Sequence, residues 1–174
     1  PYTTLFRSEE NFGNCAGKKL CFVGDGRNNV ARSLMVISAK LGMHFTIVSP
    51  RELWPDSELE NLCESFAKAS GSTLTITDEV DNGVKGADAI YTDVWVSMGE
   101  EALKAERVKL LAPYQVNAEL MAKTGNNACI FLHCLPAVKG EEVTFDVIEG
   151  PQLKVFDEAE NRKHTIKAII LATL

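Results

Sequence analysis

Short apolar runs alternate with helix-like stretches along the chain. The runs have the length and content of buried strands, and turn residues bound them. The predicted strands cover residues 18–23, 44–49, 73–77, 88–92, 129–132 and 153–156. Helical patterns are predicted at residues 56–70, 101–111 and 117–123, with a short turn near Val80 and a terminal helix. This βαβ alternation predicts an α/β fold: an open, mostly parallel, doubly wound (Rossmann-like) sheet with helices on both faces.

The first helix is predicted from one apolar stripe. Val30, Leu34, Ile37 and Leu41 recur at intervals of three or four residues, which places them on one face of a helix. Gly42 stands where a helix-terminating glycine belongs. The first unit of the fold is therefore expected to be a strand, a turn-rich loop and a helix.

Composition narrows the class of protein. The chain has 174 residues, 45% hydrophobic and 24% charged, which suits one well-cored soluble domain. No run approaches the ~20 apolar residues of a membrane span, and no signal peptide is apparent, so we expect a cytoplasmic protein without a membrane partner. A net charge of −6 without a basic stripe argues against nucleic acid as a partner. Five scattered cysteines predict reduced thiols, and neither a metal nor another cofactor is expected.

Four loops are candidates for a binding site. Ligands of such sheets bind at the carboxyl ends of the strands, where the connecting loops converge. The loops that follow predicted strands cover residues 25–29, 93–99, 133–136 and 157–162.

The first loop, GDGRNN, begins with glycines that permit a tight turn. It only superficially resembles a dinucleotide-binding turn, because Asn28 and Asn29 interrupt the G-x-G-x-x-G spacing, so NAD is not expected. One asparagine can cap the following helix, and an asparagine beside a helix N-terminus can hold a substrate carboxylate. Both roles are compatible if different asparagines perform them.

The other loops carry groups that suit an amino acid, and each also has a structural interpretation. Asp93 and Ser97 could cap a helix or bind an α-ammonium group. Cys134 could be a small buried residue, although its place beside His133 at a strand end favours a site. Arg162 could be a solvated side chain, or its guanidinium could hold a phosphate or carbonyl oxygen.

Together and in this order, GDGRNN, DVWVSMGE, FLHCLP and FDEAENRKHTIKA resemble the ornithine carbamoyltransferase family, from about Glu9 to the C-terminus. The resemblance implies a domain that binds L-ornithine. It belongs to an enzyme of arginine biosynthesis that transfers the carbamoyl group of carbamoyl phosphate to the δ-amine, giving citrulline and phosphate. The SMG residues of the second loop favour ornithine over aspartate, whose carbamoyltransferase carries HPLP-like residues at the third loop. Relatives that act on putrescine or acetylornithine differ around the second loop.

The resemblance also assigns roles to individual residues. It implies that Asn29 holds the ornithine carboxylate, and that Asp93, Ser97 and the Met98 backbone surround the α-amino group. Cys134 and Leu135 would meet the reacting atoms. Arg162 would contact carbamoyl phosphate.

Two loops of that family, S-T-R-T and H-P-T-Q, do not occur here, and residues 1–8 resemble nothing that precedes the domain in the family. We therefore expect residues 1–8 to be a foreign or disordered leader and residues 9–174 to be the ornithine-binding domain, with the carbamoyl phosphate domain absent. This piece is expected to be inactive alone, and its parent to be a homotrimer or a multiple of it. An apolar stripe predicts self-association through the terminal helix. Its members are Ile166, Ile169, Ile170 and Leu174.

In the implied reaction the δ-amine must lose a proton before it attacks. With a lysine-like pKa of about 10.4, roughly 0.4% of the amine is neutral at pH 8. Cys134 is the candidate helper, as a base or positioning group rather than a covalent nucleophile, because a thiol with a reference pKa near about 8.5 titrates in a useful range. Three alternatives are a non-catalytic amino-acid-binding module, a carbamoyltransferase for another amine or amino acid, and a nicotinamide-dependent oxidoreductase fragment.

Overall fold

Five parallel strands form one open sheet in the computed structural model of the chain, which describes residues 2–96 and 99–174. The strand order is β3-β2-β1-β4-β5, and every pair is parallel. The strands are β1 (Lys19–Val23), β2 (His44–Val48), β3 (Leu74–Thr77), β4 (Ala89–Thr92) and β5 (Ile130–His133). This confirms the predicted open, doubly wound α/β class.

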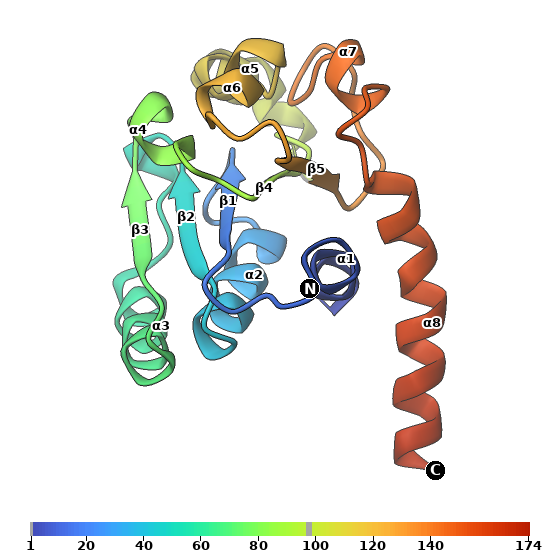
Figure 1. The fold of residues 1–174 in the computed structure, drawn as a ribbon. Coiled ribbons are helices and arrows are strands. Elements are labelled where there is room, and N and C mark those ends of the chain that lie inside the picture. Colours follow the sequence, from blue (N-terminus) through green and yellow to red (C-terminus); the bar gives the residue numbers. More distant parts are fainter. Residues whose placement is uncertain (1, 97–98) are drawn as a thin grey trace.

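Helices cover both faces of the sheet (Figure 1). One face carries α2 (Asn29–Lys40) and α3 (Ser57–Ser70). The other carries α4 (Val80–Val84), α5 (Lys104–Leu111), α6 (Ala118–Lys123) and α7 (Phe145–Ile148). Helix α8 (Val155–Thr173) contacts β5 and α1 (Tyr2–Phe12). Short 3-10 turns occur at Arg51–Leu53 (η1), Glu101–Leu103 (η2) and Ala112–Tyr114 (η3).

The central strand β1 shows why the strands appear as continuous apolar runs in the sequence. Leu20 and Phe22 pack into the core beneath α2 and α3, whereas Cys21 and Val23 pack into the core on the opposite face. All four side chains are buried. A strand buried on both faces has no polar face to alternate with the apolar one.

The order of the strands locates the expected binding crevice. From β1 the chain proceeds outward through β2 and β3, and it then returns to add β4 and β5 on the other side of β1. The direction of winding therefore changes between β1 and β4. Loops at the carboxyl ends of two such strands diverge and leave a crevice, which is where ligands bind in open α/β sheets.

Two predicted elements differ from the structure. The strand expected at 153–156 is absent, because Leu153 forms only an isolated bridge to Phe131 and Val155 begins α8. Asp157 and Glu158 favour a helix there, since acids in a first turn interact well with the helix dipole. In α2 the face that packs inward is shifted from the predicted stripe, and Leu41 is 47% exposed. The buried residues of α2 are Ala31, Leu34, Met35, Ser38 and Ala39.

The N-terminal segment is helical where the structure describes it. Residues 2–8 form most of α1. Helix α1 packs against α8, where the Thr4 hydroxyl donates a hydrogen bond to Glu158 Oε1 at 2.5 Å. The foreign origin of residues 1–8 remains a prediction.

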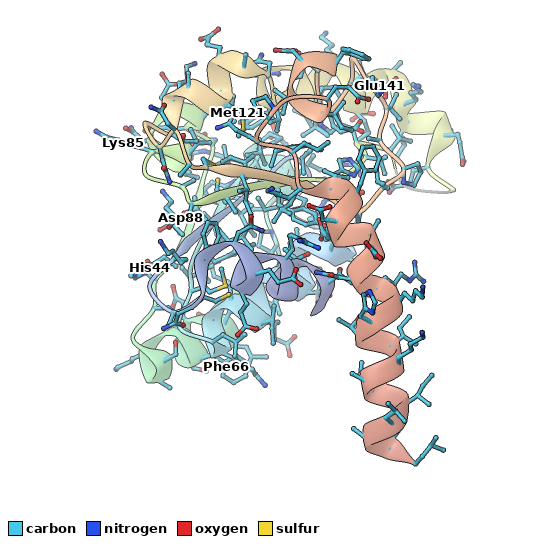
Figure 2. All side chains as sticks on the ribbon, turned by 45° about the vertical axis from the view of Figure 1, so that its right-hand side comes forward. His44, Phe66, Lys85, Asp88, Met121 and Glu141 are labelled. Carbon is cyan, nitrogen blue, oxygen red and sulfur yellow. The ribbon has the colours of Figure 1, made fainter. Side chains whose placement is uncertain are left out.

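The C-terminal half of α8 extends beyond the rest of the molecule, with its side chains surrounded by open space (Figures 1 and 2). The predicted apolar stripe lies on this part of the helix, and its members are about half exposed or more. They are Ile166, Ile169, Ile170 and Leu174, to which the exposed Leu171 is added. Among the helices that the structure describes, none is long and apolar enough to cross a membrane.

Candidate functional site

A pocket of about 470 Å³ opens where β4 and β5 end. The N-terminus of α2, helix α1 and helix α8 all contribute residues to its lining. It contains the side chains that the sequence predicted at three separate loops, Asn29, Cys134 and Arg162. The other lining residues are Thr3, Val30, Tyr91, His133, Glu158, Ala159, Thr165, Ile166 and Ile169.

The two asparagines of the first loop have different roles. Asn28 is the N-cap of α2, because its Oδ1 accepts hydrogen bonds from the backbone N–H groups of Val30 (2.6 Å) and Ala31 (3.3 Å). Its Nδ2 donates to Asp93 Oδ2 at 2.7 Å, which joins the loops after β1 and β4 across the crevice. Asn29 is exposed and lines the pocket. The capping interpretation is confirmed for Asn28, whereas the Asn29 side chain lines the pocket.

Asp93 connects three parts of the site. Its Oδ2 accepts from Asn28, and its Oδ1 accepts from the Val94 backbone at 2.8 Å and from Cys134 Sγ at 2.9 Å. The side chain is buried at the carboxyl end of β4. A carboxylate offers about four acceptor positions, so roughly one remains for a ligand.

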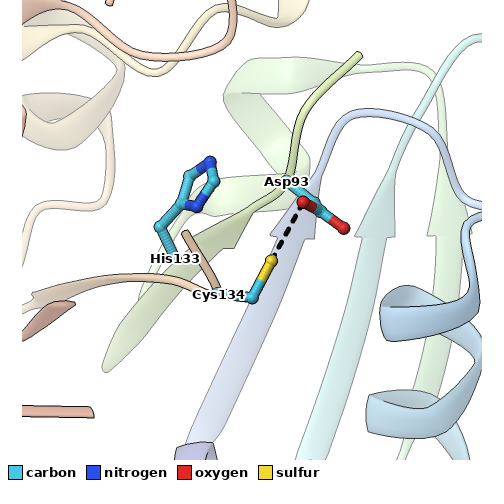
Figure 3. Close-up of side chains that lie close together, drawn as sticks. All are labelled: Asp93, His133 and Cys134. Atoms are coloured by element: carbon cyan, nitrogen blue, oxygen red, sulfur yellow. Dashed lines mark hydrogen bonds between the residues drawn. The ribbon is translucent and has the colours of Figure 1, made fainter. Parts of the chain in front are cut away.

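Cys134 points toward Asp93 from the end of β5 (Figure 3). Burial of the thiol raises the pKa of Cys134 far above its ordinary value, and the Asp93 carboxylate, the acceptor of its proton, raises it further. Cys134 as a whole residue is exposed, but its sulfur atom is partly covered. The pKa depends on the surroundings of the sulfur atom. The expectation that this thiol titrates in the working range is therefore wrong for this structure, because the thiol stays protonated.

His133 and Glu142 form a buried pair beneath Cys134. His133 Nδ1 accepts a hydrogen bond from the Leu135 backbone at 2.9 Å, which leaves Nε2 to carry the ring proton. Nε2 lies 3.3 Å from Glu142 Oε1, an oxygen that also accepts from the Val138 backbone at 2.5 Å. This contact is not aligned as a hydrogen bond, and His133 Nε2 has no hydrogen-bond partner among the described residues. The hydrogen bond from the Leu135 backbone ties the His133 ring to the chain beside Cys134.

Leu135 has a backbone φ of +54°, which is unusual for a residue with a branched side chain. Such conformations persist where the surrounding structure enforces them, and they cluster at functional sites. The Leu135 side chain is half-buried, packs against the core, and does not line the pocket. The structure thus does not bring Leu135 together with the other predicted site residues.

Glu158 is a site residue that the sequence analysis missed. The residue is 2% exposed and lines the pocket, and its Oε2 has no hydrogen-bond partner in the described structure. Burial raises the pKa of Glu158 to about 7. Burial of the Tyr91 hydroxyl, together with the nearby Glu158 carboxylate, raises the pKa of Tyr91 well above its usual value. Glu158 lies four residues before Arg162, a spacing that places both on one face of a helix and could have identified it.

The remaining predicted residues have simple outcomes. Arg162 is exposed on α8 and directed to the pocket. Ser97 and Met98 lie outside the described residues. The hydrogen bond from Asn28 to Asp93 had no local sequence signal, because the two residues are 65 positions apart.

Asp93, His133 and Cys134 each offer a possible metal-ligand atom, and these atoms lie within 4.8 Å of one another. Their present bonding does not favour a metal. Cys134 Sγ donates a hydrogen bond to Asp93 Oδ1, and His133 Nδ1 accepts one from the Leu135 backbone. A metal would require a deprotonated thiol and the loss of both hydrogen bonds.

Fold and site together define an open, parallel α/β domain with a small-molecule pocket at the topological switch point. Comparison with known proteins narrows this class. The sequence model described as "Aspartate/ornithine carbamoyltransferase, Asp/Orn binding domain" matches residues 16–173. The chain therefore belongs to the aspartate/ornithine carbamoyltransferase family, as its Asp/Orn binding domain.

Individual relatives agree. The chain is 59% identical over 170 residues to the ornithine carbamoyltransferase of Caldanaerobacter subterraneus, covering 98% of this chain and 54% of that protein. It is 52% identical to a catabolic ornithine carbamoyltransferase of Bacillus licheniformis, covering 95% of this chain and 55% of that protein. The solved ornithine carbamoyltransferase of Pyrococcus furiosus superposes with a TM-score of 0.91 at 43% identity, covering 97% of this chain and 53% of the other. The chain thus spans about half the length of the relatives it matches.

Proposed function

We propose that residues 9–174 are the ornithine-binding half of an ornithine carbamoyltransferase. The observation that best supports this is the pocket where Asn29, Cys134 and Arg162 meet beside Asp93. The complete enzyme transfers the carbamoyl group from carbamoyl phosphate to the δ-amine of L-ornithine, and this chain alone is inactive. In that reaction a nitrogen–carbon bond forms, the carbon–oxygen bond to phosphate breaks, and the amine loses a proton.

The amino-acid end of the substrate is proposed to lie between the first two loops. Asn29 stands at the N-terminus of α2, where its side-chain amide and the helix dipole favour a carboxylate. Asp93 has about one acceptor position left for an α-ammonium group. Ser97 and the Met98 backbone are proposed, from the family resemblance, to complete this end of the site.

The reacting end is proposed to lie against the side chains of Cys134 and Arg162 and beside the backbone of Leu135. Because the Cys134 thiol is protonated and bonded to Asp93, we assign it a positioning role and not that of a base. The exposed guanidinium of Arg162 suits a phosphate or carbonyl oxygen of carbamoyl phosphate. We further propose, from the resemblance, a role in arginine biosynthesis, a cytoplasmic location and a trimeric parent enzyme.

Titration calorimetry on the purified chain tests ligand choice. L-Ornithine and L-norvaline, which share the α-amino and α-carboxyl groups, should both bind, whereas NAD should not. Asp93→Asn should weaken ornithine binding by more than about tenfold, which corresponds to about 1.4 kcal/mol. The matched control is Asp88→Asn, since Asp88 immediately precedes the same strand at its opposite end. Equal losses in both variants, or binding of NAD in place of ornithine, would refute the assignment.

A chimera tests catalysis. This chain would replace the corresponding domain of the Caldanaerobacter relative, so that the complete length is restored. The chimera should form citrulline, and Asp93→Asn and Ser97→Ala in it should raise the KM for ornithine far more than that for carbamoyl phosphate. Ornithine binding by the chain with no citrulline from a folded chimera would instead indicate a non-catalytic amino-acid-binding module.

A further inference from the structure

A buried arginine outside the pocket is paired with the loop that carries the two asparagines. Arg107 lies on α5 and is 7% exposed. Its Nη1 is 2.8 Å from Asp25 Oδ2, and its Nη2 is 3.4 Å from Glu100 Oε1. The Asp25 side chain is itself only 11% exposed, so this ion pair is largely removed from water. Removing one member of such a pair leaves an uncompensated buried charge.

Asp25 organises the turn that follows β1. Its Oδ1 accepts from the Arg27 backbone at 2.9 Å, and its carbonyl oxygen accepts from the Asn28 backbone at 3.1 Å. Its Oδ2 is the atom that Arg107 holds. One residue therefore closes the turn internally and also anchors it to α5.

The turn has little freedom to move toward the sheet. A Cβ atom added at Gly26 would come within 2.8 Å of the Leu53 carbonyl oxygen and 2.9 Å of Ile47 Cγ2, both closer than normal contacts allow. The loop is thus packed directly against η1 and β2, and the Arg107–Asp25 pair holds it from α5. Asn28 and Asn29 follow this turn directly, so the position of the turn sets where they lie.

We propose that Arg107 is a positioning residue for the amino-acid end of the pocket, acting through Asp25 on the 25–29 loop. The loop places Asn28 so that its amide holds Asp93 at 2.7 Å, and it directs Asn29 to the pocket. Displacements of about 1 Å in such groups are enough to cost large factors in binding or rate. The inference rests on the proposed function, because it takes the amino acid to lie at this end.

Hydrogen exchange on the purified chain tests the loop directly, without any ligand. In Arg107→Gln, the backbone amides of Asn28, Val30 and Ala31 should exchange at least about tenfold faster, while those of β5 are unchanged. Arg107→Lys keeps the charge and should restore part of the protection. Lys109→Gln is the matched control, since it removes the same charge from an exposed position on the same helix. Unchanged exchange in Arg107→Gln would overturn the proposal.

Ornithine affinity separates positioning from mere structural support. Arg107→Gln and Asp25→Asn should each weaken binding by at least about tenfold, and the double variant should be no weaker than the worse single variant, because both act along one path. Additive losses, or faster exchange with unchanged affinity, would overturn the positioning role. If the unmodified chain binds no ornithine, the proposed function fails, and the exchange experiment still decides whether Arg107 orders the loop.

Discussion

Replacing Glu158 by glutamine should remove a large part of the pH dependence of stability between about pH 4.5 and pH 7. Burial raises the pKa of this carboxyl from 4.5 to about 7, so the folded chain keeps a proton that the unfolded chain releases. The resulting stabilisation is fully present below about pH 4.5 and is lost as the pH rises through 7. The pKa difference of about 2.5 units between the folded and unfolded states corresponds to about 3 kcal/mol of unfolding free energy, at about 1.36 kcal/mol per unit.

The neighbours of Glu158 do not obscure this effect. The pKa values of Tyr91 and Cys134 are both raised, so both groups stay protonated throughout the range. Glutamine is neutral and keeps an oxygen that can accept from Thr4. Glu158→Gln should therefore match the unmodified chain near pH 4.5 and exceed its free energy of unfolding by up to about 3 kcal/mol at pH 8.

Urea denaturation at pH 4.5, 5.5, 6.5 and 8 measures the difference, provided that the m-values agree. Glu160→Gln is the control, because it removes an equal charge from an exposed position on the same helix. The reasoning is refuted if Glu158→Gln is no more stable than the unmodified chain at pH 8, or if Glu160→Gln shows the same gain.

Three further outcomes are expected. At pH 8, iodoacetamide should alkylate the Cys134 thiol more than about tenfold more slowly than it alkylates the thiol of free glutathione, and Asp93→Asn should accelerate the alkylation of Cys134. Equal alkylation rates for Cys134 and glutathione would contradict the raised pKa. Asn28→Ala should lower the free energy of unfolding by about 1–2 kcal/mol and Asn29→Ala by under about 0.5 kcal/mol in urea titrations, and equal losses would contradict the capping assignment. Sedimentation should show association of the unmodified chain that Ile169→Glu abolishes; a monomeric unmodified chain at high concentration would exclude it.

The strands were predictable because they are buried on both faces, which leaves continuous apolar runs between turn residues. The α2 surface was predicted less well, since a helix that packs against both a sheet and α3 buries small residues that a stripe of large apolar residues does not reveal. Ala31 and Ala39 are nearly inaccessible, whereas Leu41 is half exposed. The run 153–156 has the composition of a strand, and only the acids after it indicate a helix.

In the site, too, local motifs were predictable and contacts between distant residues were not. Asn29, Cys134 and Arg162 were identified from motifs, and the structure brings them to one pocket. The protonation state of Cys134 was not predictable, because it depends on Asp93, 41 positions earlier in the sequence. The pairing of Arg107 with Asp25 spans 82 positions. Hydrogen bonds and ion pairs of this kind depend on how the strands are ordered in the sheet, which local patterns do not specify.

Helix α8 joins two regions by one rigid rod. Glu158 and Arg162 lie near its buried end, and the apolar stripe lies on its protruding end (Figure 1). At about 1.5 Å per residue, Arg162 is about 10 Å and Leu174 about 28 Å from Val155. A tilt of about 10° about Val155 would therefore move the tip by about 5 Å and Arg162 by about 2 Å. A partner that tilted the protruding end would therefore also move Arg162 at the pocket, by less than half as far.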